Sequence, residues 1–133
     1  MINGKIVDTS VWIDYFNGKI DERTNATEKF IIEGELLMLP IILQEVLQGI
    51  RSPKDFSIVK NAFLRNTFFN FNTIDMALEA ATLFRFLKRN GVTIRKPNDS
   101  LIAAICIQNN FSLLHNDKDF NNIAKYTSLK IYK

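Results

Sequence analysis

The stretch Lys5-Ile6-Val7-Asp8-Thr9-Ser10-Val11-Trp12-Ile13 decides the fold of this chain. Its first three residues predict a short strand, and Asp8 stands directly at the carboxyl end of that strand. Asp8, Thr9 and Ser10 offer capping side chains, so they predict a helix that begins near Val11. A strand that passes directly into a helix is typical of proteins built around a parallel sheet.

The rest of the chain continues this alternation of strands and helices. Helices are predicted over residues 22–33, 40–50, 53–64, 75–90, 99–109 and 118–125, and strands over 36–39, 67–71, 111–114 and 129–132. Asn98 is expected to cap the helix at 99–109. The pattern predicts an α/β fold with a mainly parallel sheet flanked by helices, and such sheets bind ligands outside the carboxyl ends of their strands.

Length and composition limit the possible classes of protein. The chain has 133 residues, enough for a single domain over residues 1–133, and 47% of them are hydrophobic, which excludes a disordered chain. The longest apolar run is interrupted by Pro40 and is far too short to span a membrane. Cys106 is the only cysteine, which fits a reducing compartment. We therefore expect a soluble, cytoplasmic protein with no membrane partner.

Four acidic residues occupy positions where a site is expected. Asp8 and Asp117 follow predicted strands, whereas Glu45 and Asp99 lie in helices that are otherwise apolar. A carboxylate beside buried segments is costly unless it is compensated, and a divalent cation would compensate several at once. Oxygen ligands without a histidine or cysteine cluster favour Mg²⁺ or Mn²⁺ over zinc.

Each of these acids also has a purely structural interpretation. Asp8 would serve as a helix cap, and Asp99 as a first-turn acid that is favoured by the helix dipole. Glu45 would be a solvated helix residue, and Asp117 would begin a turn. The residues alone leave both interpretations open for each acid.

Four stretches resemble, in order, the motifs of a known family. They are residues 8–16 (DTSVWIDYF), 43–49 (LQEVLQG), 98–104 (NDSLIAA) and 114–120 (LHNDKDF), and together they extend over nearly the whole chain. They resemble PIN-domain proteins of the VapC type, the toxins of bacterial toxin–antitoxin pairs. The resemblance implies a PIN-like three-layer sandwich and metal-dependent cleavage of RNA.

The resemblance also implies the site and its partners. Asp8, Glu45, Asp99 and Asp117 match the acidic quartet of the family, as catalytic residues and as ligands of one or two Mg²⁺ or Mn²⁺ ions. Metal-bound water would attack the phosphorus of the RNA and leave a 5′-phosphate. The implied partners are an RNA substrate, a cognate antitoxin protein that covers the acidic site, and a second copy of the chain in a homodimer.

Apolar helix faces favour the homodimer independently of the resemblance. One predicted helix carries Trp12, Tyr15 and Phe16, and another carries Phe84, Phe86 and Leu87. These are more large apolar side chains than one small core readily buries.

Secondary candidates surround the four acids. Ser10 would hold a metal-bound water or cap the helix that follows Asp8. Arg95 and Lys96 would contact RNA phosphate or form a solvated charged loop. We assign Asp117 as the fourth ligand and Asp119 as a helix cap or a neighbour of the ligands. His115, the only histidine, is expected to pack at the end of a strand rather than act as a general base.

Three other functions are compared with the endoribonuclease. A phospho-receiver domain needs paired early acids and an acceptor aspartate at a middle strand end, but Asp8 stands alone and the middle strand ends in Leu39-Pro40. A haloacid-dehalogenase-type phosphatase needs an aspartate two residues after Asp8, where Ser10 stands. A catalytically silent PIN scaffold that binds RNA or protein stays possible, and the sequence names neither the RNA target nor the antitoxin.

Overall fold

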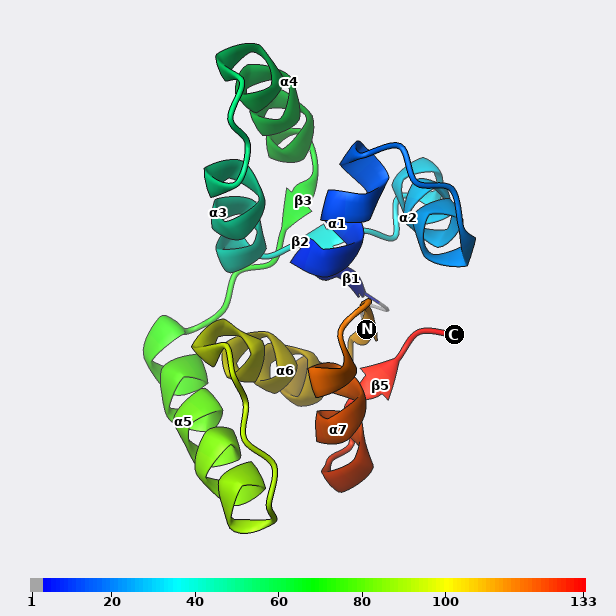
Figure 1. Ribbon diagram of the computed structural model, residues 1–133. Coiled ribbons are helices and arrows are strands. Elements are labelled where there is room, and N and C mark those ends of the chain that lie inside the picture. Colours follow the sequence, from blue (N-terminus) through cyan, green and yellow to red (C-terminus); the bar gives the residue numbers. More distant parts are fainter. Residues whose placement is uncertain (1–3) are drawn as a thin grey trace.

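The computed structural model describes residues 4–133 as five strands and seven helices. The strands are β1 (Lys5–Val7), β2 (Leu37–Met38), β3 (Thr67–Phe68), β4 (Ser112–Leu114) and β5 (Lys130–Ile131). The helices are α1 (Thr9–Phe16), α2 (Glu22–Glu33), α3 (Pro40–Gln48), α4 (Pro53–Leu64), α5 (Thr73–Arg89), α6 (Pro97–Asn109) and α7 (Lys118–Tyr126). In Figure 1, α1 to α4 lie in the upper part of the view with β2 and β3 among them, and α5 to α7 lie in the lower part, with β5 beside α7.

Every strand pairing in the described residues is parallel. One sheet has the order β1-β4-β5, and β2 pairs with β3. A parallel bridge between Lys5 and Leu36 joins the two groups at β1 and β2. The strand order is therefore β3-β2-β1-β4-β5, and all carboxyl ends lie at one edge. This arrangement, with helices on both sides, confirms the predicted α/β sandwich.

The apolar pattern explains why β1, β4 and α6 form the centre of the molecule. Ile6, Val7, Leu113 and Leu114 are all buried, as expected for parallel strands that are covered on both faces. Helix α6 is buried nearly all round, because residues 102–106 are all inaccessible to solvent. The residues at the start of α6 are consequently drawn into the core, and Asp99 is one of them.

Local capping explains most of the helix boundaries. Asp8 caps α1 as predicted, and α2 begins with a capping box at Asp21 and ends at Gly34, whose φ of 69° suits glycine. The predicted cap at Asn98 is wrong. Lys96 occupies the N-cap position of α6 and Pro97 begins the helix, because proline is tolerated in a first turn, where its missing N–H is not needed.

The two helix faces that favoured a homodimer are less exposed than the sequence suggested. Trp12 and Leu87 are only 1% and 0% exposed, so they belong to the core, whereas Phe16 and Phe86 remain exposed. Trp12 packs edge-on against Phe63 with ring centroids 4.8 Å apart. In the part of the chain described here, none of the helices has the length and apolar character that a membrane crossing requires.

Candidate functional site

Asp8 lies at the carboxyl end of β1, where it also caps α1. Its Oδ2 accepts hydrogen bonds from the Ser10 N–H at 3.1 Å and from the Ser10 hydroxyl at 2.6 Å. Its own N–H donates to the Leu114 carbonyl at 2.9 Å, which holds the ends of β1 and β4 together. Burial raises the pKa of Asp8 although both Ser10 bonds lower it. Asp8 can cap α1 and bind a metal at the same time, because both Ser10 bonds use Oδ2 and leave Oδ1 for a metal.

Ser10 connects the ends of two neighbouring strands. Its hydroxyl donates to Asp8 and accepts from the Asn116 N–H at 3.0 Å. Ser10 is therefore a residue of the first turn of α1 and not its cap, which corrects one of the two sequence interpretations. The serine fixes the Asp8 carboxylate relative to the segment that leads from β4 to Asp117.

Glu45 reaches the same region from α3. Its Oε1 accepts from the Thr9 hydroxyl at 2.8 Å, and its Oε2 is 3.4 Å from the Asn98 amide nitrogen, which donates to it. The carboxylate thus joins the start of α1 to the start of α6 and is not a freely solvated helix residue. Thr9 and Asn98 were not predicted as site residues, although each is a direct neighbour of a motif acid in the sequence.

Asp99 is a buried acid at the start of α6. It lies in the first turn of α6, it is 3% exposed, and its Oδ2 is buried without a hydrogen-bond partner among residues 4–133. Burial and, to a smaller extent, the charges of Asp8, Asp117 and Glu45 together raise the pKa of Asp99 to about 7 against the opposing charge of Lys96. The four acids therefore share one electrostatic environment.

Asp117 and Asp119 both face Asp99. One carboxylate oxygen from each of these three residues lies within 4.8 Å of the other two. Asp117 is the N-cap of α7 and accepts from the Asp119 N–H at 3.0 Å. Of the two roles predicted for Asp119, the cap position is occupied by Asp117, whereas Asp119 is an acid of the first turn of α7 and lies beside the other carboxylates.

Arg95 and Lys96 place positive charge against this cluster. Lys96 Nζ lies 2.9 Å from Asp117 Oδ2, and Arg95 Nε donates to Asp119 Oδ2 at 3.1 Å. Burial raises the pKa of Asp117, but the Lys96 bond, the Asp119 N–H and the charge of Arg95 together bring it below its usual value. The two basic residues are thus paired with the acids in the described structure.

His115 is a buried residue that contacts the backbone of Asp117. It is buried, its ring lies 5.3 Å from that of Phe120, and its Nδ1 accepts from the Asp117 N–H at 3.0 Å. Burial lowers the pKa of His115, so the ring is held neutral. These contacts are those of a packing residue at the end of a strand, as predicted.

The arrangement fits a hard divalent cation. The available donors are carboxylate oxygens from the ends of β1 and β4 and from α3 and α6, which is the ligand set that Mg²⁺ and Mn²⁺ prefer. The unpartnered Oδ2 of Asp99 is a buried acceptor that such an ion would satisfy. Carboxylates that raise one another's pKa are relieved either by a proton on one of them or by a cation between them, and a bound cation would allow all of them to ionise.

Comparison with known proteins agrees with this geometry. A family model described as "PIN domain" matches residues 5–126. A VapC ribonuclease of Mycobacterium bovis and ribonuclease VapC11 of Mycobacterium tuberculosis are each 30% identical over 94% of this chain and 95% of their own length. The chain belongs to the VapC family of PIN-domain proteins.

Solved structures share the PIN fold of this VapC-family chain. VapBC2 of Rickettsia felis, bound to a promoter DNA fragment, has a TM-score of 0.76 at 20% identity and covers 96% of both chains. DNA-bound VapBC of Salmonella typhimurium has a TM-score of 0.75 at 20% identity, with 97% of this chain and 96% of the other covered. The four motifs on which the sequence resemblance rested thus belong to a shared fold.

Proposed function

We propose that this VapC-family chain is a metal-dependent endoribonuclease that hydrolyses RNA phosphodiester bonds and acts as the toxin of a toxin–antitoxin pair. The observation that carries the proposal is the buried, unpartnered Oδ2 of Asp99 in a cluster of carboxylates at the carboxyl edge of the sheet. The names of the VapC relatives, which are ribonucleases, support RNA as the substrate.

Asp8, Glu45, Asp99 and Asp117 would hold Mg²⁺ or Mn²⁺, and Asp119 is a further candidate ligand. Such an ion, when bound, makes water a nucleophile at neutral pH and offsets charge on the phosphate. The chain's own residues orient these ligands: Ser10 holds Asp8, and Thr9 holds Glu45. Arg95 and Lys96 lie beside the acids and would contact an RNA phosphate.

The same proposal includes protein partners. The similar solved structures are described as VapBC assemblies, which supports a cognate antitoxin for this chain, and the homodimer rests on the exposed apolar residues of its helices. Ile13 and Phe16 on α1 are 51% and 42% exposed, which leaves apolar surface for such contacts. Because Cys106 is a buried free thiol, we place the protein in the reducing cytoplasm.

Cleavage of RNA with and without metal tests the proposal. The purified chain is incubated with total RNA and with a single-stranded RNA in MgCl₂, in MnCl₂ and in EDTA. We expect cleavage only with metal, its loss in Asp99→Asn, and its retention in Asp75→Asn. The last variant is a matched control, because Asp75 is also a first-turn acid but lies in α5. RNA binding without cleavage in either metal would instead identify a silent scaffold.

A further inference from the structure

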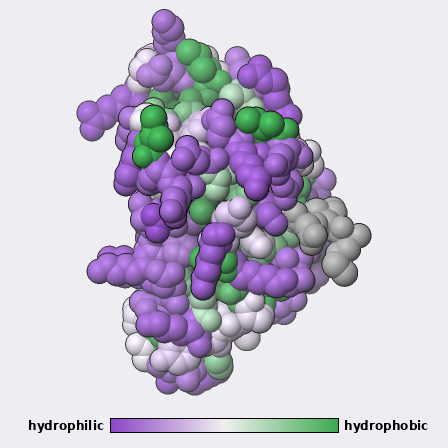
Figure 2. All heavy atoms as spheres, turned by 90° about the vertical axis from the view of Figure 1, so that its right-hand side faces the viewer, coloured by the Kyte–Doolittle hydropathy of each residue, from purple (hydrophilic) through white to green (hydrophobic). Residues whose placement is uncertain are grey.

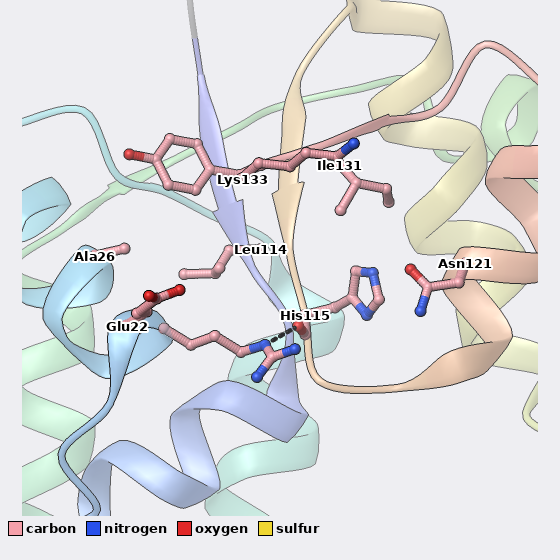
Figure 3. Close-up of a pocket in the computed structure, with 9 residues that line it drawn as sticks. Glu22, Ala26, Leu114, His115, Asn121, Ile131 and Lys133 are labelled. Atoms are coloured by element: carbon pink, nitrogen blue, oxygen red, sulfur yellow. Dashed lines mark hydrogen bonds between the residues drawn. The ribbon is translucent and has the colours of Figure 1, made fainter.

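Arg23 on α2 is bonded to the chain segment that leads from β4 to Asp117. Its Nε–H donates to the His115 carbonyl at 2.8 Å, across 92 positions of the sequence. Figure 3 shows this bond at the wall of a cavity of about 320 Å³, which both residues line. Arg23 belongs to none of the four motifs that indicated the family, so the bond connects a residue outside the motifs to the fourth of them.

The His115 carbonyl and the Asn116 N–H belong to one planar trans peptide unit, in which the two groups point to opposite sides. The N–H donates to Ser10 Oγ at 3.0 Å, and that hydroxyl in turn donates to Asp8 at 2.6 Å. The carbonyl accepts from Arg23 on the other side. The peptide unit is therefore held between α1 and α2, and these two bonds fix its orientation.

This peptide unit determines where the Asp117 carboxylate lies relative to Asp8. Asp117 follows directly after Asn116, and its N–H donates to His115 Nδ1 at 3.0 Å. With the preceding peptide and its own N–H both bonded, Asp117 has little freedom to move. Such restriction matters for a metal ligand, because Mg²⁺ demands near-ideal octahedral geometry from the oxygens that bind it.

The bond from Arg23 is not duplicated on its side of the segment. On the α1 side, the Asp8 N–H holds the Leu114 carbonyl at 2.9 Å, and Asp14 accepts from the Asn116 side chain at 3.1 Å. On the α2 side, Arg23 is the one side chain of the described helix that bonds to residues 114–117. If Arg23 were replaced, water in the adjacent cavity would bond to the carbonyl, but water would not fix its direction.

We propose that Arg23 is a positioning residue of the candidate metal site. Through the peptide between His115 and Asn116, it holds the Asp117 carboxylate in place relative to Asp8. The inference rests on the metal-dependent function proposed above. Arginine suits this role, because its guanidinium is always charged and its rigid donor geometry gives a strong, directed hydrogen bond.

Metal binding by the RNA-free protein tests the positioning role. The full chain is titrated with MgCl₂ and with MnCl₂ by calorimetry. We expect Arg23→Gln to bind either ion about tenfold more weakly, as is typical when a group that orients a metal ligand is lost. Arg23→Lys should recover part of the affinity, because an ammonium also donates to a carbonyl. Both variants should fold, because Arg23 is exposed and the α2 side of the molecule, viewed in Figure 2, is mostly hydrophilic.

Two controls on α2 separate positioning from stability. Lys29→Gln removes an exposed charge from the same helix and should leave metal affinity unchanged. Asp21→Ala removes the N-cap of α2, so it should lower the melting temperature while metal affinity stays as in wild type. If Asp21→Ala lost as much metal affinity as Arg23→Gln, the stability of α2 would explain both losses and the proposal would be overturned.

Cleavage at increasing MgCl₂ distinguishes this proposal from the proposed function. Arg23→Gln should need about tenfold more Mg²⁺ for its half-maximal rate and should approach the wild-type rate at saturation. Wild-type metal affinity in Arg23→Gln, or a reduced rate that more Mg²⁺ does not restore, overturns the positioning role and leaves the ribonuclease intact. Metal binding that depends on Arg23, without RNA cleavage in either metal, overturns the ribonuclease and supports the positioning role.

Discussion

Lys96 and Asp117 form a 2.9 Å ion pair that joins the N-termini of α6 and α7. Each residue occupies the N-cap position of its helix. The bond to Asp117 is the main cause that raises the pKa of Lys96, and the same bond helps to lower the pKa of Asp117. The site therefore contains a fixed positive charge from the chain itself, next to the carboxylates that would hold a metal.

Replacing Lys96 with glutamine should weaken RNA binding without weakening metal binding. The ammonium would contact phosphate, so we expect RNA affinity to fall severalfold and its salt dependence to decrease by about one unit of slope. Magnesium affinity should stay equal or rise, because a competing cation beside Asp117 is removed. RNA affinity is measured in the Asp8→Asn background, with Lys125→Gln on α7 as control, and equal RNA affinity in both would remove Lys96 from the RNA surface.

Asp8→Asn should abolish metal-dependent cleavage and leave the fold intact. Asparagine caps a helix as well as aspartate does, but it lacks the charge that a hard cation needs. Because burial raises the pKa of Asp8, the ionised carboxylate is unfavourable in the folded protein at neutral pH. Melting of the metal-free variant should therefore occur at an equal or higher temperature than wild type.

Asp8→Ala separates the capping role from the charge. It should also lose cleavage, but it should cost about 1 kcal/mol of stability, because the side-chain acceptor for the Ser10 N–H is lost. Wild-type cleavage rates in Asp8→Asn would show that Asp8 lies outside the active centre.

The elements that depend on local sequence were predictable, and those that depend on distant contacts were not. Strand β1, the cap at Asp8 and the apolar face of α1 all lie within a few residues of one another, so the local sequence predicts them. The core segment of α6, residues 101–107, is likewise apolar throughout. The predicted strand at 67–71 was too long, because only Thr67 and Phe68 pair with β2. Pairing depends on where the partner strand ends, which no local pattern shows.

The same distinction applies to the candidate site. The four acids could be selected from the sequence because each stands in a motif or beside an apolar run. The Ser10–Asn116 bond and the contact of Asn98 with Glu45 join segments that are distant along the chain. They exist only because the parallel sheet brings the ends of β1 and β4 together, so no spacing rule could reveal them.

The contribution of Asp99 to the stability of the metal-free protein should fall as the pH rises towards 7. The pKa of Asp99 is raised from 3.8 to about 7, so between these values the folded state holds a proton that the unfolded state has lost. Folding is then favoured at the lower pH and loses this contribution as the pH approaches 7. The difference in unfolding free energy between Asp99→Asn and wild type should therefore grow with pH across this window and level off above it.

Thermal melting of both proteins in EDTA measures this effect, and the comparison cancels the contribution of His115, which the two proteins share. Adding MgCl₂ near pH 8 should raise the melting temperature of wild type and have much less effect on Asp99→Asn. A stability difference between the two proteins that is the same at every pH would mean that Asp99 has the same pKa in the folded protein and in the unfolded chain.

Substitutions of Asp117 and of Asp119 should have different effects on metal-dependent cleavage and on stability. Asp117 is both the cap of α7 and the assigned ligand. Asp117→Asn should lose metal-dependent cleavage and keep the cap while losing the ion pair with Lys96, whereas Asp117→Ala should also lose the cap, at a further stability cost of about 1 kcal/mol. Asp119→Asn should keep the cap and disturb only the pairing with Arg95 and the outer part of the cluster. Magnesium titrations of cleavage rate, with melting of all three variants, measure both properties. A larger loss of metal dependence in Asp119→Asn than in Asp117→Asn would exchange the two assignments, because both carboxylates lie within reach of Asp99.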